Sequence, residues 1–308
     1  MAVLISELPT QPGARAEGRF TVTAPPTPTR GYPDIHAMTI CDASGSVECL
    51  YRPALPKTEW LSPSMGEGVF AHLNRAENRF GVAYWRIERL IPLHMEAIMQ
   101  GIPCEQCPKP QWISALGHLI HRRIHSETVV GFLQSVFNQR DIMEPFLRFG
   151  ASSYVHHCEP GGLFEHSVKA AVRLAEIIDE ATSPLERDCC IAGMLFHDIG
   201  KIAPAFSKTG LLRSKDHPFL MGMILSDALD MLRLVDRPAW EIMHYVFGVI
   251  AGIYDDSRIP LTKFIRTVDQ YHAAEDARMR VCGRKQTGSG TLVASTGQVY
   301  LQAHRRTS

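Results

Sequence analysis

The spacing of apolar residues divides this chain into two parts with different periods. From Gly18 to about Pro92, apolar and polar residues alternate in short runs, as they do in β-strands with one buried face. From Trp112 to about residue 281, apolar residues instead recur every three or four positions, as on the buried face of a helix. We therefore expect a small β-domain followed by a larger helical one.

Five alternating runs in the first part predict five short strands, because turn-forming residues separate each run from the next. These runs are Arg19–Ala24, Ala37–Cys41, Ser46–Tyr51, Gly68–Leu73 and Phe80–Ile87. Five strands within about 75 residues are typical of a small closed barrel or sandwich. The hairpin from Thr39 to Tyr51 is similar to one found in OB-folds that bind single-stranded nucleic acid.

The expected fold class is α+β with several domains: a small N-terminal, OB-like β-barrel followed by an all-α domain. Residues 98–111 carry three prolines and two cysteines without a regular period, which marks them as a linker. The expected boundaries are a tail over 1–17, the barrel over 18–97, the linker over 98–111, the helical domain over 112–282, and a flexible tail or hairpin over 283–308.

Composition and charge are those of an ordinary soluble protein. Apolar residues make up 45% of the chain, and 32 Lys and Arg balance 32 Asp and Glu, so the whole molecule carries no strong field. No apolar run approaches the ~20 residues of a membrane span, and the N-terminus shows no secretory signal. Cys104 and Cys107 form a single CxxC, which is more typical of reduced thiols than of a four-ligand zinc site. We expect a cytoplasmic protein with no membrane partner.

An adjacent histidine and aspartate, His197 and Asp198, close an apolar run and precede Gly200 and Lys201. Imidazole nitrogen and carboxylate oxygen can bind one divalent cation together, and the pair suits Mn, Fe, Mg or Zn. Further candidate ligands lie in segments of helical period, namely His166, His217, His244 and Asp269. The doublet and its surroundings predict a metal site.

The order of these residues resembles the pattern H…HD…D of the HD superfamily of metal-dependent phosphohydrolases. The residues that this resemblance assigns to a first metal ion are His166, His197, Asp198 and Asp269. The resemblance also implies an activated water that attacks phosphorus, and a position for Lys201 near the substrate phosphate.

A second ion would need further ligands, for which His217 and His244 are the candidates. The segment that begins at His217 is similar to an "HPxxGAxIL" helix of two-metal HD proteins, with one extra residue before Gly222. His244 lies where relatives often have two adjacent histidines, but Tyr245 replaces the second. We expect one or two divalent ions, manganese first, with Mg, Fe, Ni or Zn as alternatives.

The pair His156 and His157 falls in a segment that resembles the "HHxxxGGLxEHS/T" pattern of two HD subgroups. One comprises YhaM-type 3′-to-5′ exonucleases, which join an N-terminal OB-fold to an HD domain. The other is the TraI-like (MobH) relaxase domain of conjugative elements. In an enzyme of the first kind, His156 or His157 would contact the scissile phosphate or protonate the leaving 3′ oxygen.

These resemblances favour a divalent-metal nuclease that degrades single-stranded DNA or RNA from the 3′ end. Two alternatives stay open: a nicking component of a conjugative element, and a phosphohydrolase of nucleotides or cyclic dinucleotides. The expected partner is single-stranded nucleic acid, and a homo-oligomer is compatible with the sequence.

Two groups of residues also have two interpretations each. In the barrel, one set of residues either forms a stacking face or lies mostly inside the barrel or scattered on it, namely Tyr51, Arg52, Phe70, His72, Trp85 and Arg86. In the helical part, a row of histidines either binds metal or phosphate or forms a solvated or subdomain-contacting face, namely His118, His121 and His125.

Overall fold

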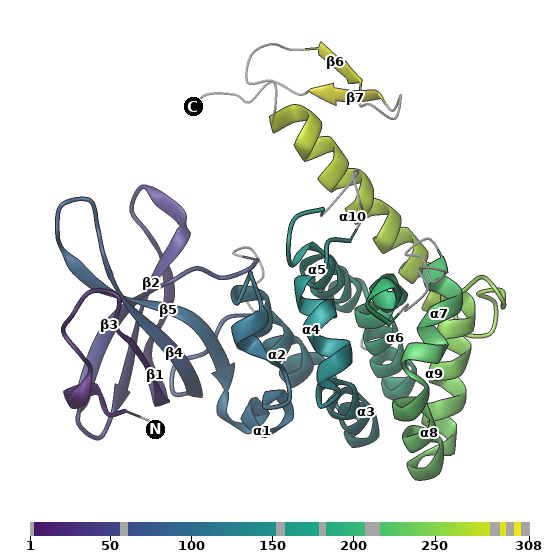
Figure 1. Ribbon diagram of the computed structural model, residues 1–308, viewed down its shortest axis with the longest axis horizontal. Coiled ribbons are helices and arrows are strands. Elements are labelled where there is room, and N and C mark those ends of the chain that lie inside the picture. Colours follow the sequence, from purple (N-terminus) through teal and green to yellow (C-terminus); the bar gives the residue numbers. More distant parts are fainter. Residues whose placement is uncertain are drawn as a thin grey trace.

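The computed structural model contains a β-barrel and a helical domain joined through a short connecting segment (Figure 1). It describes residues 3–55, 61–151, 158–178, 183–206, 216–283, 290–293 and 299–302. Within these ranges, none of the helices combines the length and apolar character needed to span a bilayer.

Five strands close the N-terminal barrel in the order β1-β2-β3-β5-β4. Their bounds are β1 (Arg15–Thr29), β2 (Tyr32–Asp42), β3 (Gly45–Tyr51), β4 (Gly68–Glu77) and β5 (Ala83–Pro92). Neighbouring strands pair antiparallel except β3 and β5, which pair parallel. The expected five-stranded, OB-like barrel is confirmed, and β1 begins ahead of Gly18, the first residue assigned to the barrel from the sequence.

The barrel interior takes one side of each strand, as the alternating pattern predicts. Tyr51 and Trp85 belong to this interior, with 3% and 5% of their surface exposed. The stacking interpretation is therefore wrong for these two residues. Alternation assigns residues to two faces, but it does not say which face closes inward when aromatic side chains occur on both.

The remaining described elements belong to the stretch before the barrel, the connecting segment between β5 and α2 (residues 93–110), the helical domain and a terminal hairpin. The helices of the helical domain are α2 (Gln111–Arg123), α3 (Glu127–Phe137), α4 (Arg140–Arg148), α5 (Gly162–Ile177), α6 (Pro184–Phe196), α7 (His217–Ile224), α8 (Ser226–Val235), α9 (Arg237–Ile250) and α10 (Thr262–Gly283). The shorter elements are η1 (Ile5–Glu7), η3 (Leu93–Met95), α1 (Glu96–Met99), η4 (Cys104–Gln106), η5 (Ile199–Phe206), β6 (Gly290–Val293) and β7 (Val299–Gln302). β6 and β7 pair antiparallel after α10.

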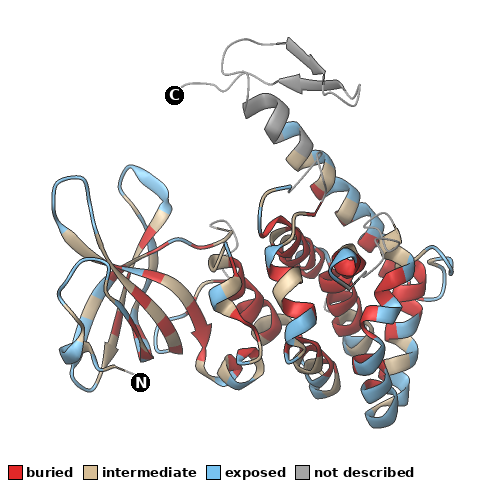
Figure 2. Ribbon diagram, viewed as in Figure 1, coloured by how far each residue is buried: buried red, intermediate tan, exposed pale blue. Residues whose placement is uncertain are grey.

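The helical core is centred on α5 and α6, whose facing sides are almost wholly buried (Figure 2). Phe196, the last residue of α6, is fully buried among the rings of Phe132, Phe137 and Phe146. Aromatic side chains contribute the largest apolar contact areas of a core, so this packing holds the end of α6 in place. The two residues that follow, His197 and Asp198, start from a rigid position.

Asp188 is a buried carboxylate that the sequence pattern does not single out. Its Oδ2 atom accepts hydrogen bonds from the backbone N–H groups of His125 and Ser126, each at 2.7 Å, and Oδ1 pairs with Arg187 at 3.1 Å. These contacts tie α6 to the N-terminus of α3, where a negative charge is favourable. Asp188 therefore stabilises the fold.

The burial of His118 on α2 predicts that the protein becomes less stable as the pH is lowered. Burial, with Arg122, His121 and His94 adding positive charge nearby, lowers its pKa to about 3. In the unfolded chain its pKa returns to about 6.5, so below that pH the unfolded state binds a proton that the folded state excludes. At pH 5 this residue should lower the free energy of unfolding by about 2 kcal/mol relative to pH 7.

Urea unfolding of the wild type and His118→Leu at pH 7 and pH 5 measures this contribution. The leucine variant should lose about 2 kcal/mol less than the wild type over this interval. His125→Gln, which replaces an exposed histidine just beyond the same helix, should keep the wild-type pH dependence. An identical loss in the wild type and His118→Leu would mean that His118 is not held neutral.

Candidate metal centre

The His-Asp doublet lies where α6 gives way to the 3-10 helix η5. His197 is the C-cap residue of α6 and keeps helical backbone angles, with φ −54° and ψ −32°. Only 4% of His197 and 3% of Asp198 is exposed. The apolar run before the doublet buries α6, so the chain carries an imidazole and a carboxylate into the core together.

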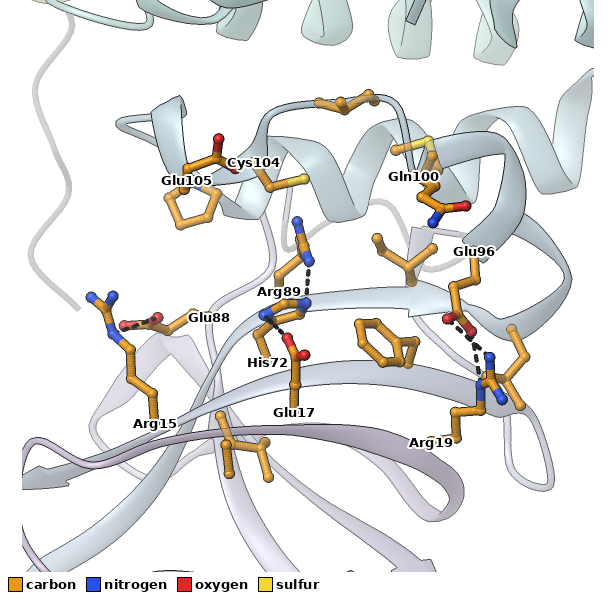
Figure 3. Close-up of a pocket in the computed structure, with 18 of the residues that line it drawn as sticks. Arg15, Glu17, Arg19, His72, Glu88, Arg89, Glu96, Gln100, Cys104 and Glu105 are labelled. Atoms are coloured by element: carbon orange, nitrogen blue, oxygen red, sulfur yellow. Dashed lines mark hydrogen bonds and ion pairs between the residues drawn. The ribbon is translucent and has the colours of Figure 1, made fainter. Parts of the chain in front are cut away.

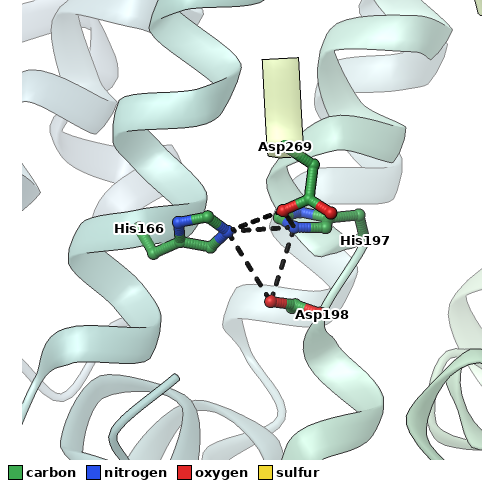
Figure 4. A group of neighbouring side chains, drawn as sticks. All are labelled: His166, His197, Asp198 and Asp269. Atoms are coloured by element: carbon green, nitrogen blue, oxygen red, sulfur yellow. Dashed lines mark hydrogen bonds and ion pairs between the residues drawn. The ribbon is translucent and has the colours of Figure 1, made fainter. Parts of the chain in front are cut away.

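Side chains from two other elements meet the doublet in one cluster (Figure 4). His166 projects from α5 and is fully buried, and Asp269 comes from α10 with 40% of its side chain exposed. α5 starts directly after Gly161, whose φ of +78° turns the chain into the helix, a conformation that favours glycine. Asp269 is the one partly exposed member of the cluster, so solvent and substrate can approach the cluster from its side.

The four side chains direct one ligand atom each at a common point. His166 Nε2 lies 3.2 Å from His197 Nε2 and 3.1 Å from Asp269 Oδ1, and His197 Nε2 lies 3.3 Å from the same oxygen. Asp198 Oδ2 lies 3.7 Å from His166 Nε2 and 3.4 Å from His197 Nε2. Within the described ranges, this is the one group of three or more such residues whose ligand atoms lie within 4.8 Å of one another.

This donor set fits a divalent ion. Ligands bound at about 2.1 Å in tetrahedral or octahedral geometry lie about 3.0 to 3.4 Å apart, close to most of these separations. His197 Nδ1 donates a hydrogen bond to the Met194 carbonyl at 2.7 Å, which leaves the lone pair of Nε2 facing the cluster. Two imidazole nitrogens and two carboxylates suit Mn, Fe or Zn better than ions that prefer oxygen alone.

Charges within the cluster stabilise one another. Burial alone would raise the pKa of Asp198, but His197, His217 and Lys201 outweigh it and hold the pKa well below its usual range. Burial likewise opposes ionisation of Asp269, yet hydrogen bonds from His166 and His197 lower its pKa. Both carboxylates are therefore ionised at neutral pH, as metal binding requires.

The two oxygens of Asp198 face different partners. Oδ2 lies near His166 and His197 and accepts a charge-assisted hydrogen bond from Lys201 Nζ at 2.5 Å. Oδ1 lies 3.2 Å from His217 Nε2, at the start of α7. One oxygen of Asp198 thus faces His166 and His197, and the other faces His217. A carboxylate shared between two ions would have this orientation.

Gly200 makes the approach of His217 possible, a role that its place two residues after the doublet does not reveal. A Cβ atom at this position would lie 2.1 Å from the His217 carbonyl oxygen, so only glycine lets η5 and α7 come this close. The contact joins residues on either side of the segment 207–215. A local motif carries no signal for such a contact.

His244 occupies a different environment from the other candidate ligands. It is exposed on α9, with its ring 5.2 Å from that of Trp240 and 6.2 Å from that of Tyr254. No described contact joins it to the cluster, so its role in a second metal site stays a prediction. Tyr245 is buried instead, and its hydroxyl donates to the Asp255 carbonyl at 2.6 Å, tying the following loop to α9.

His156 and His157 are the remaining candidates from the sequence, and Lys109 is a residue that the sequence did not single out. His156 and His157 lie outside the described residues. Lys109, in the connecting segment, pairs with Glu159 at 3.0 Å and with Glu165, the neighbour of His166. This clamp ties the connecting segment to the start of α5, and it was not apparent from the sequence because its partners are 50 and 56 positions away.

Comparison with known proteins identifies the helical part. A family model described as "HD domain" matches residues 163–274, which include all four residues of the cluster. No curated protein and no solved structure matches the chain. Proteins of the HD family are metal-dependent hydrolases that bind divalent ions. The chain therefore carries an HD domain with an assembled His/Asp cluster, preceded by a five-stranded, OB-like barrel.

Proposed function

We propose that this protein is a divalent-metal-dependent nuclease that shortens single-stranded DNA or RNA from the 3′ end. One combination supports the proposal: an HD metal centre follows a barrel whose exposed turns present aromatic and cationic side chains. The centre by itself would serve any phosphate ester. The barrel is what favours a polymer.

The two turns that carry these side chains are β1–β2 and β4–β5. Tyr32 and Phe80 expose 64% and 74% of their surface, and both have an arginine neighbour nearby in sequence, Arg30 and Arg79. The Arg79 guanidinium lies 4.7 Å from the centre of the Phe80 ring. Figure 1 draws both turns at the upper end of the barrel. Exposed aromatic rings beside cations suit unpaired bases joined by phosphates.

A cavity on the barrel is less suited than the turns to bind a polyanion. It measures about 940 Å³ and lies between the outer face of β1, β4 and β5 and the connecting segment (Figure 3). Its ionic groups already pair with one another, as Arg19 does with Glu96 and Glu17 with His72. Four glutamates face three arginines along its walls, namely Glu17, Glu88, Glu96 and Glu105 against Arg15, Arg19 and Arg89. We therefore assign strand binding to the turns.

Each residue of the HD centre would have its own role in this reaction. His166, His197, Asp198 and Asp269 would hold the ion, and His217 would extend the site through the second oxygen of Asp198. A bound divalent ion lowers the pKa of its water and stabilises the charge that develops on phosphorus. Lys201 lies beside Asp198 and would neutralise a phosphate oxygen, while His156 or His157 would contact the scissile phosphate or protonate the leaving 3′ oxygen.

Digestion of 5′-labelled single strands, alongside a panel of free nucleotides and cyclic dinucleotides, tests the proposal. We expect a ladder of products that shortens with time from the 3′ end in the presence of Mn²⁺. A 3′-phosphorylated or 3′-blocked strand should be degraded more slowly. Turnover of the nucleotides with intact strands would refute the nuclease and leave the metal-dependent phosphohydrolase.

The barrel turns make a separate prediction. In Tyr32→Ala/Phe80→Ala, each lost stacking contact is expected to cost about 1 to 3 kcal/mol of binding, so KM for a 20-nucleotide strand should rise at least about tenfold. The kcat value, and the rate on a small chromogenic phosphodiester, should stay near those of the wild type. Val82→Ala removes an exposed side chain from the same turn as Phe80 and serves as the matched control. Equal KM values in all three proteins would contradict a role of the turns.

A further inference from the structure

The outer face of the barrel carries a row of ionic side chains that faces the connecting segment. In the strand register, Glu17 on β1 lies opposite His72 on β4, and His72 lies opposite Arg89 on β5. Residues paired in this way project to the same face of a sheet, so the three side chains form a row across three strands. This row lines the cavity of about 940 Å³ between the barrel and the connecting segment (Figure 3).

The four glutamates along this cavity are balanced by other groups. Three of them form ion pairs, namely Glu96 with Arg19 at 2.9 Å, Glu88 with Arg86 at 3.1 Å, and Glu105 with Arg140 at 3.4 Å. The fourth, Glu17, contacts His72 Nδ1 at 3.3 Å, and 45% of its side chain is exposed, so water also solvates its charge. These carboxylates therefore do not require a cation from outside the protein.

Arg89 differs from the other ionic groups of the cavity. Its partly buried guanidinium donates a hydrogen bond to His72 Nε2 and reaches the Cys104 sulfur (Figure 3). Burial and the charge of Arg89 lower the pKa of His72 to about 4, and burial raises the pKa of the Cys104 thiol, so both partners are neutral at pH 7. Among the described residues, no carboxylate is in ion-pair contact with Arg89. Cations removed from water are normally paired, so this one is suited to bind an anion.

An apolar wall lies beside Arg89. The next row of the same face contains Phe70 on β4, opposite Ile91 on β5. Leu93, the first residue of the connecting segment, lines the cavity with them. Phe70 and Leu93 are only partly buried, so part of their apolar surface faces the cavity. A cavity with an apolar wall and a few well-placed polar groups is typical of small-molecule sites.

We propose that this cavity binds a small organic monoanion, with its carboxylate on Arg89 and its apolar body against Phe70 and Leu93. A guanidinium binds a carboxylate through parallel N–H···O hydrogen bonds. One arginine without a counter-ion matches a single negative charge, whereas a nucleic-acid strand brings one for every phosphate. The volume of about 940 Å³ is sufficient for a ligand of this class. The ligand would contact the barrel and the connecting segment together and hold the two against each other.

Isothermal titration calorimetry of the full-length protein with 2-naphthoate and 2-naphthamide tests this site. The two probes share an apolar ring system and differ in that only the first carries a charge. EDTA is present throughout, so that a metal ion in the HD centre cannot bind the carboxylate. We expect 2-naphthoate to bind at least about tenfold tighter than 2-naphthamide, because hydrogen bonds to charged groups are stronger than those to neutral groups. Acetate, which lacks the apolar body, should bind at least about tenfold more weakly than 2-naphthoate.

Three variants locate the binding site. Arg89→Gln keeps a hydrogen-bonding side chain without the charge, so it should bind the two naphthyl probes with equal affinity. Arg15→Gln removes another arginine of the same cavity, whose side chain is 78% exposed, and it should keep the wild-type preference for the carboxylate. Ala97 is an exposed residue of α1 that lines the cavity, so Ala97→Trp should fill the space and abolish binding of 2-naphthoate. This third variant decides the outcome if Arg89→Gln does not fold by circular dichroism.

Equal affinities of the wild type for the two naphthyl probes would overturn the proposal, as would the absence of 2-naphthoate binding at millimolar concentration. An equal loss of 2-naphthoate binding in Arg89→Gln and Arg15→Gln would also overturn it, since general attraction to positive charge would then explain the binding. Undiminished binding in Ala97→Trp would place the probe elsewhere. None of these results depends on the proposed nuclease activity, because a protein without that activity can still bind the monoanion, and an active nuclease can fail to bind it.

Discussion

Replacing His197 or Asp198 with alanine should remove divalent metal from the HD centre and lower the rate of phosphodiester hydrolysis by at least about a thousandfold. His197 supplies one of two imidazoles, and Asp198 contacts both of them as well as His217. Without either residue the cluster loses one of its four ligands. The direct measurements are metal content and the rate on a chromogenic phosphodiester.

Control variants separate loss of the ligand from loss of the fold. Asp198→Asn keeps the size of the side chain and removes its charge, so it should also lose metal while its circular dichroism spectrum stays unchanged. Asp230→Ala removes a carboxylate on α8 whose side chain is 68% exposed, and it should bind metal and turn over substrate as the wild type does. Full metal content and activity in His197→Ala would falsify the assignment of the centre.

The variant Gly200→Ala should destabilise the protein by about 3 kcal/mol and displace His217 from Asp198. The added methyl group would meet the His217 carbonyl oxygen at 2.1 Å, and backbone on both sides leaves little room to adjust. Either η5 or α7 has to move, and the 3.2 Å contact of His217 Nε2 with Asp198 Oδ1 breaks. Urea unfolding measures the stability, and a metal titration measures the affinity and number of bound ions.

The matched control for this change lies on α7 itself. A Cβ atom on Gly222 would meet nothing within 4 Å, so Gly222→Ala should leave stability unchanged or raise it by about 0.5 to 1 kcal/mol, since alanine is the better helix former. We expect its metal titration to match that of the wild type. If Gly200→Ala were as stable as Gly222→Ala, the close approach of η5 and α7 would not exist in solution.

Local patterns were sufficient for the elements of the fold, and the family resemblance for the four residues of the His/Asp cluster. Alternation and helical period each depend on neighbouring residues, so the change near the connecting segment predicts a barrel followed by helices. The cluster His166, His197, Asp198 and Asp269 follows from the resemblance to HD proteins, and the structure brings these four together. A stable ligand set of this kind leaves a trace in sequence because each residue type is required by the chemistry.

The tertiary structure decided where the remaining candidates lie. His217 approaches the centre while His244 stays exposed, although the sequence offered both on equal terms. Tyr51 and Trp85 lie in the barrel interior, and His94 contacts His121.

What the sequence determined by itself was therefore the order of the two domains and the members of one His/Asp cluster, because periodicity and ligand chemistry are properties of residue types along a chain. Contacts across elements, such as Gly200 against the backbone of His217, depend on how closely two segments pack. That distance is set by the volumes of all the side chains between and around them, so only the folded structure decides it.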